Sequence, residues 1–345
     1  MDWGAIIETT FRGLIGEQFI YFGLAAIGLN LHFGFTGLLN FGQAAYMAAG
    51  AYGLAIIVVT IGPRLNDDEG IFKLNISDGW MFLLGVFVGV IIVPLFLSFL
   101  MGIPTLRLRA DYLAIVTIAV AEMIRLTMRS PRFDWFTGAS DGLSGFSRTF
   151  YDLSPFEANQ RYFFNLFIGN QMFLVIVGWI VLAISAFVCW LIIRSPWGRV
   201  LKAIREDEDA ARSLGKNAYS YKMQALVLGG IFGAIGGMLR AIGFSLAQPD
   251  NFITDVTFFV WVALILGGAG KVFAPLIGAA LLYAVLGFTD VFLRQAVDND
   301  LIPDSVMSGT QVGQVRFMLI GLALLAAFRP QGIFGNKEEM ALDDR

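Results

Sequence analysis

The chain has 345 residues, of which 57% are hydrophobic and 15% are charged, and its formal net charge is −3. An ordinary soluble domain carries about 25% charged residues, so this composition excludes a typical soluble protein. The weak negative charge, with Lys and Arg confined to short stretches, excludes a polybasic nucleic-acid-binding surface. We therefore expect an integral membrane protein that has the lipid bilayer as its solvent.

Long apolar runs recur along the whole chain. A helix rises about 1.5 Å per residue and the bilayer core is about 30 Å thick, so one crossing needs about 20 apolar residues. The runs predict an all-α, polytopic transmembrane bundle of about 8–10 helices in a single domain, 1–345. Some helices are expected to be broken or half-length, because glycines interrupt the chain around 33–43. The predicted segments are 14–33, 43–62, 80–102, 110–129, 172–194, 223–247, 252–270, 272–294 and 314–328.

The loops differ in charge. Residues 194–222 hold seven Lys or Arg, whereas the loop after residue 296 holds Asp298, Asp300 and Asp304 and no cation. The positive-inside rule places the first loop in the cytoplasm and the second outside. By alternation, the C-terminus is expected in the cytoplasm and the loop 130–171 outside, while the side of the N-terminus stays open.

The basic loop predicts a helix. Pro196 ends the preceding segment, strong helix formers follow, and Gly215 is a suitable C-terminal stop. Acidic residues lie near its start and Arg212 and Lys216 near its end, which matches the helix dipole. We expect a short cytoplasmic helix at about 196–220. The alternative is a solvated loop that only sets the orientation.

Several motifs together carry a family resemblance. They are Asp209 to Gly215, close to the E-A-A-x-x-x-G pattern of importer permeases, and the stretches 28–43, 104–113, 137–143, 266–270 and 329–332. On these motifs the chain resembles the permease subunits of branched-chain amino-acid ABC importers, specifically the LivM-like type. Ala110 and Ala139 depart from the pattern, since the family usually has glycine there.

The resemblance implies a function and partners. It implies a permease fold similar to the vitamin B12 and Liv-type importers, in the plasma (inner) membrane of a bacterium or archaeon. It also implies a homologous sister permease, two cytoplasmic ABC ATPases that bind ATP and Mg, and an extracytoplasmic substrate-binding protein. The residues expected to couple to the ATPase are Arg205, Glu206, Asp207, Glu208, Asp209, Ala210, Ala211 and Gly215.

Polar residues inside apolar segments are costly unless they are paired or wetted, so each is a candidate for the substrate pathway. The candidates are Asn30, His32, Asn40, Gln43 and Arg240. The structural alternative is that His32 and its neighbours are satisfied hydrogen-bond donors. For Arg240 the alternative is snorkelling or pairing with an acid.

A glycine face predicts close helix packing. Gly229, Gly233 and Gly237 recur every four residues, so they share one side of the segment 223–247. The same small-residue spacing also suits helices that slide past each other during alternating access.

Missing motifs separate the remaining function classes. The stretch Gly267 to Lys271 is not a Walker A loop, because Ile265 and Val272 stand where glycine and Ser or Thr are required. With one histidine and one cysteine in the chain, we expect no metal site. The chain has no H-E-x-x-H zinc motif, so we expect no catalytic residue, and we expect no bound cofactor because ATP is hydrolysed on another polypeptide. The alternative to an ATP-driven importer is an ion-coupled secondary transporter. For the importer, urea or short amides are alternatives to neutral amino acids as substrate.

Overall fold

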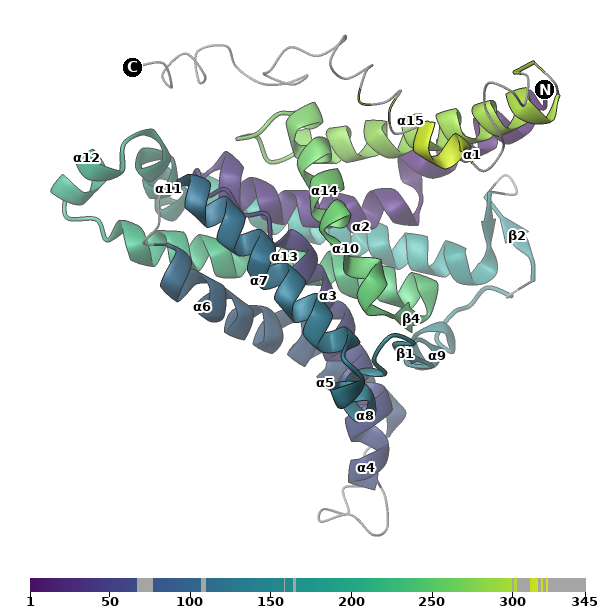
Figure 1. The fold of residues 1–345 in the computed structure, drawn as a ribbon, viewed down its shortest axis with the longest axis horizontal. Coiled ribbons are helices and arrows are strands. Elements are labelled where there is room, and N and C mark those ends of the chain that lie inside the picture. Colours follow the sequence, from purple (N-terminus) through teal and green to yellow (C-terminus); the bar gives the residue numbers. More distant parts are fainter. Residues whose placement is uncertain are drawn as a thin grey trace.

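The computed structural model describes residues 1–66, 77–106, 110–157, 159–163, 166–299, 301–302, 311–315, 318 and 321. Within these residues the chain is a bundle of helices, with only two pairs of two-residue strands (Figure 1). In the part of the chain that the structure describes, seven stretches are long and apolar enough to cross a membrane, which confirms an all-α polytopic protein. They are Trp3–Gly34, Gln43–Arg64, Asp78–Thr105, Gly169–Arg194, Ala218–Phe244, Pro249–Gly267 and Ala274–Asp298.

The helices of the first half follow the predicted segments closely. The first stretch extends further towards the N-terminus than the predicted 14–33 and bends at Gly16, whose backbone is extended. A short π-helical turn ends the first stretch, and two others interrupt the second and third. The helices are α1 (Trp3–Ile15), α2 (Glu17–Leu29), η1 (Asn30–Gly34), α3 (Gln43–Ala55), η2 (Ile56–Ile61), α4 (Gly62–Asn66), α5 (Asp78–Phe87), η3 (Val88–Ile92), α6 (Val93–Thr105) and α7 (Ala110–Arg129).

The predicted loop 130–171 contains short elements: η4 (Pro131–Phe133), α8 (Asp134–Thr137), β1 (Leu143–Ser144), α9 (Arg148–Tyr151), β2 (Arg161–Tyr162) and β3 (Phe167–Ile168). Strand β1 pairs with β4 (Leu246–Ala247), which joins this loop to the segment after α13. The second half continues with α10 (Gly169–Arg194), α11 (Pro196–Glu206), α12 (Glu208–Ser213), α13 (Ala218–Phe244), η5 (Pro249–Phe252), α14 (Thr254–Gly267) and α15 (Ala274–Asp298).

Two sequence expectations need correction. The stretch 196–220 is two helices rather than one, because Asp207 has an extended backbone and its side chain caps α12 at Ala210 N. The segment 223–247 ends at Phe244, because Ser245 takes a left-handed conformation and β4 follows. The predicted segment 314–328 lies almost entirely outside the described residues.

The core is built around α13. This helix packs along α2 and α3, and all three are buried over most of their length. The glycine face lies at these contacts: a Cβ on Gly229 would meet His32, one on Gly233 would meet Gln43, and one on Gly237 would meet the backbone of Met47. By contrast, α5, α6 and α10 expose large apolar side chains such as Phe96 and Ile184, as expected of helices that face lipid.

The bundle has two distinct ends. Figure 1 shows α11 and α12 at one end, and β1, β2 and α9 at the other. We call the first the α12 end; it also contains residues 34–37 and 268–271, because Arg205 contacts Gly34 and Asn30 contacts Lys271. We call the second the β1 end; it comprises residues 130–168 and 245–253. The N-terminal residue Asp2 contacts Gln295, near the far end of α15 from Lys271.

Candidate functional site

Four of the predicted pathway residues meet in one buried cluster where α2 ends and α3 begins. His32 Nε2 lies 3.0 Å from the backbone oxygen of Leu226, and its Nδ1 lies 3.0 Å from Asn40 Nδ2. A carbonyl oxygen only accepts and an amide NH2 only donates, so the imidazole is neutral with its proton on Nε2. Both side chains are at most 1% exposed. His32 therefore links α13 to the loop that carries Asn40.

Asn30 and Gln43 extend this cluster to other helices. Asn30 Nδ2 donates to Lys271 O at 3.0 Å, and Asn30 Oδ1 accepts from Gly270 N at 2.9 Å. Gln43 Nε2 donates to Ala25 O at 3.1 Å, whereas Gln43 Oε1 is buried and has no partner among the described residues. Most polar atoms of the cluster thus hold the ends of helices together. This agrees with the structural alternative, in which these residues are satisfied hydrogen-bond donors.

Asn40 also anchors an aromatic side chain. Its backbone oxygen accepts from Trp261 Nε1 at 3.2 Å, and the Trp261 ring stacks on Phe41 with centroids 4.7 Å apart. Because Trp261 belongs to α14, the turn between η1 and α3 is fixed to the second half of the chain. Trp261 and Thr257, whose Oγ1 accepts from Ala44 N at 2.9 Å, were not among the predicted residues.

The expected coupling residues form the α12 end. Glu206, Asp207, Asp209, Ala210 and Gly215 are exposed there, whereas Ala211 is buried and Glu208 is half-buried. Asp207 Oδ1 accepts from Ala210 N at 2.9 Å, and Glu208 pairs with Lys222 and with Arg212. Gly215 has a φ of +77°, a conformation that strongly favours glycine and ends the element.

Arg205 points in a different direction from the exposed acids. Its Nη1 donates to the backbone oxygen of Gly34 at 2.5 Å, so the guanidinium is bound within the membrane domain. Gly34 is the last residue of η1, and a Cβ there would meet Asn30 Oδ1 and Gly270 N. A continuous chain of contacts therefore runs from α11 through Gly34 and Asn30 to the turn before α15.

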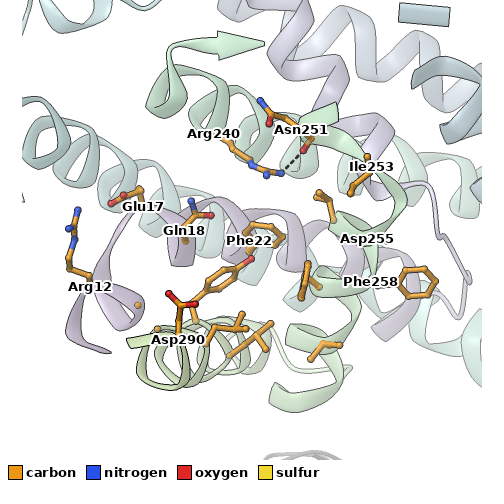
Figure 2. A pocket seen from close by; sticks show the side chains of 18 of the residues that line it. Arg12, Glu17, Gln18, Phe22, Arg240, Asn251, Ile253, Asp255, Phe258 and Asp290 are labelled. Atoms are coloured by element: carbon orange, nitrogen blue, oxygen red, sulfur yellow. Dashed lines mark hydrogen bonds between the residues drawn. The ribbon is translucent and has the colours of Figure 1, made fainter. Parts of the chain in front are cut away.

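Arg240 lies apart from this cluster, at a cavity of about 860 Å³ between α1, α2, α14 and α15. Figure 2 shows Arg240 and Asn251 above Phe22, with Glu17 and Asp290 on other sides of the cavity. Asn30, His32, Asn40 and Gln43 do not line it. The ionisable acids and cations that line it are Arg12, Glu17, Arg240, Asp250, Asp255 and Asp290.

A short stretch at the β1 end has the letters of a catalytic motif. Gly138 to Gly142 match the letters of the G-x-S-x-G nucleophile elbow, which requires a strand, a sharp turn and a helix. Here the five residues form a turn after α8, and Ser140 O accepts from Gln248 Nε2 at 2.9 Å. His32, the sole histidine of the chain, contacts Leu226, about 27 Å along α13 from that end. The motif therefore lacks both the elbow geometry and a histidine partner.

The sequence also matches a known protein family. The family described as the branched-chain amino acid transport system permease component matches residues 14–327, nearly the whole chain. The chain belongs to this family. It is thus a multi-pass membrane transport permease, as the sequence motifs predicted.

Curated relatives agree with this family. The chain is 29% identical over 326 residues to the high-affinity branched-chain amino acid transport system permease protein LivM of Escherichia coli, covering 90% of this chain and 67% of the relative. It is 25% identical over 350 residues to a probable LivM of Methanocaldococcus jannaschii, covering 94% of each. A shorter match, 26% over 178 residues, joins about half of this chain to about half of the autoinducer 2 import system permease protein LsrC of Yersinia pestis. No solved structure matches, so the likeness to the vitamin B12 importer fold stays a prediction.

Proposed function

We propose that this chain is one permease subunit of an ATP-driven importer that carries branched-chain amino acids. In this proposal two separate ATPase subunits bind ATP and Mg, a homologous permease completes the membrane pathway, and a binding protein delivers the substrate. The family membership and the similarity to LivM permeases support the substrate class.

The observation that carries the proposal is the form of the α12 end. Two short helices leave the membrane bundle, expose acidic residues such as Asp209, and return to the bundle at Ala218. Arg205 ties the same element to Gly34 in the first membrane stretch. An exposed element bound to a buried span at its base suits a subunit that receives a mechanical signal from an ATPase.

The orientation follows from charge. The α12 end carries the dense run of Lys and Arg in residues 194–222, so we assign it to the cytoplasm by the positive-inside rule. The β1 end then faces the exterior of a bacterial or archaeal plasma membrane, where a binding protein would dock. By the same alternation, the tail from Arg329 would lie in the cytoplasm.

The experiment is a pull-down of the tagged full chain from its native membrane, with identification of the co-purifying proteins and an ATPase assay. We expect Walker-A ATPases and a second permease, and we expect their recovery to fall when residues 209–215 are scrambled. As a control, residues 153–157 at the β1 end are scrambled in the same way, with ATPase recovery unchanged.

Two other outcomes would overturn the proposal. Recovery of the folded chain alone, with gradient-driven uptake that needs no ATP, would indicate a secondary transporter. ATP-driven uptake of urea or short amides in preference to leucine, isoleucine and valine would replace the substrate class and leave the importer assignment intact.

A further inference from the structure

We infer that the cavity beside Arg240 is a transient binding site for a zwitterionic amino acid with an apolar side chain, held by its carboxylate at Arg240. The inference rests on the proposed importer function and deepens it. It assigns the substrate site to this chain at the β1 end, away from the buried polar cluster around His32.

The first observation is the state of the Arg240 guanidinium. A guanidinium has five N–H donors, and Nη1 of Arg240 donates to Asn251 O at 2.7 Å. Its Nε is buried with no partner among the described residues, and no carboxylate of those residues forms an ion pair with it. Nη2 forms no hydrogen bond with the described residues and is not buried, so a ligand acceptor can reach it, and a cation without a counter-ion in this surrounding is costly. A ligand carboxylate is the acceptor that fits this fork, because the two groups pair through parallel hydrogen bonds.

The second observation is how the guanidinium is held. Its Cζ lies 5.6 Å from the ring centroid of Phe22, 5.5 Å from that of Phe244 and 5.7 Å from that of Phe252. These rings come from α2, from the end of α13 and from η5, and they stabilise the cation without neutralising it. Arg240 therefore has no counter-charge among the described residues, and a ligand carboxylate can supply it.

The third observation is the cavity itself. Its volume of about 860 Å³ is in the range of small-molecule sites, and its wall is largely apolar, with Phe22, Phe258, Phe259 and Leu282. A branched aliphatic side chain would lie against this wall. The wall thus supplies the second element of recognition, an apolar surface close to a fixed cation.

Acidic groups supply the third element. Four carboxylates and two guanidinium groups line the cavity. Asp250 and Asp290 are already paired, with Arg125 and Arg294. Glu17 and Asp255 lie on either side of Arg240 in Figure 2, on α2 and α14. Glu17 and Asp255 can therefore attract the ammonium group of an amino acid, whereas urea has no formal charge that pairs with them or with Arg240.

The test is a saturation-transfer NMR titration of the assembled permease complex in nanodiscs, without the binding protein. The probes are L-leucine, leucinamide, which lacks the carboxylate, 4-methylpentanoate, which lacks the ammonium group, and urea. We expect leucine to bind most tightly. Arg240→Gln should weaken leucine binding about 10- to 100-fold, as the loss of a charged hydrogen-bonded pair predicts, and Asp255→Asn with Glu17→Gln should weaken leucine but not 4-methylpentanoate.

Controls separate binding from folding. Arg148→Gln changes an exposed arginine at the same end of the bundle and should leave leucine binding unchanged. Arg240→Lys keeps the positive charge but loses the two parallel N–H donors of the guanidinium, so it should bind leucine with intermediate affinity. This variant keeps the inference testable if Arg240→Gln fails to assemble. Equal binding of leucinamide and leucine, or an unchanged affinity in a well-assembled Arg240→Gln complex, would overturn the inference.

ATP-driven leucine uptake by the complete wild-type importer, measured separately, reports on the proposed function. If the wild type takes up leucine and Arg240→Gln still binds leucine with unchanged affinity, the proposed site at Arg240 is wrong and the proposed importer function stands. Absence of any ATP-driven amino-acid uptake would remove both.

Discussion

The guanidinium of Arg205 donates a hydrogen bond of 2.5 Å to the backbone oxygen of Gly34, 171 positions earlier in the chain. One partner belongs to the exposed α11–α12 element, and the other closes the first membrane stretch. We therefore expect a movement of α11 to be transmitted directly to η1. From there it reaches Asn30, which holds the turn before α15 through Lys271 O and Gly270 N.

This bond predicts that Arg205→Gln uncouples ATP hydrolysis from transport. A hydrogen bond to a charged group contributes about 1.5–3 kcal/mol, so its loss should leave η1 largely unlinked to α11, and the amount of leucine imported per ATP should fall. ATPase activity of the assembled importer should persist, because the exposed face of α12 is unchanged. The measurement is uptake of radiolabelled leucine and release of phosphate in the same proteoliposomes.

The matched control for this prediction is Arg199→Gln, an exposed arginine on the same helix. It removes the same charge from α11 and should leave the ratio of leucine to ATP unchanged. If Arg199→Gln and Arg205→Gln lower the ratio equally, the effect comes from net charge, and the link to Gly34 is not used.

Asn30 is predicted to be a stability residue. Asn30→Ala removes both side-chain bonds to the 270–271 turn and leaves the Gly270 N–H and Lys271 O without them. We expect the free energy of unfolding to fall by about 2–4 kcal/mol. Thermal unfolding in detergent checks this, with Asn170→Ala in the first turn of α10 as the control. Equal midpoints for the two variants would contradict the assignment.

The contact between α3 and α13 predicts a packing defect. A Cβ on Gly237 would lie against the backbone of Met47, which cannot move aside as a flexible side chain would. Gly237→Ala should therefore destabilise the chain by about 1–3 kcal/mol, despite the better helix propensity of alanine. Gly79→Ala, at a helical glycine with open space around it, should be neutral or slightly stabilising in the same unfolding assay.

His32 and Asn40 should be energetically coupled. Because Asn40 Nδ2 donates to His32 Nδ1, a double-mutant cycle of His32→Phe and Asn40→Ala should give a coupling energy of about 0.5–3 kcal/mol. The free energies come from the unfolding of the four proteins. Additive effects of the two substitutions would show that the pair does not act as a unit.

Sequence patterns predicted the membrane helices well, because length and apolarity alone determine them. The predicted 172–194 and 80–102 correspond to Gly169–Arg194 and Asp78–Thr105. The break at Asp207 was not predicted, although aspartate is a preferred N-cap residue that accepts a hydrogen bond from the backbone N–H three residues later. The helix at 110–129 is present as α7 but is not among the seven strongly apolar stretches.

The contacts within the site were beyond sequence reasoning. Arg205, Asn30 and His32 all bond to backbone oxygens, and every residue offers such an oxygen, so no residue type marks the partner. The cavity beside Arg240 depends on η5 returning towards α2 after the left-handed Ser245. The sequence identified Arg240 as a candidate, but the three aromatic rings around it are brought together only by the fold.

The most direct test is leucine uptake into proteoliposomes that contain this chain with its co-purified permease and ATPases. The binding protein is added on one side of the membrane, and ATP is supplied or withheld on the side of the ATPases. We predict uptake that requires ATP and is lost when residues 209–215 are scrambled. Uptake by this chain alone, driven by an ion gradient in the absence of ATP, would contradict it.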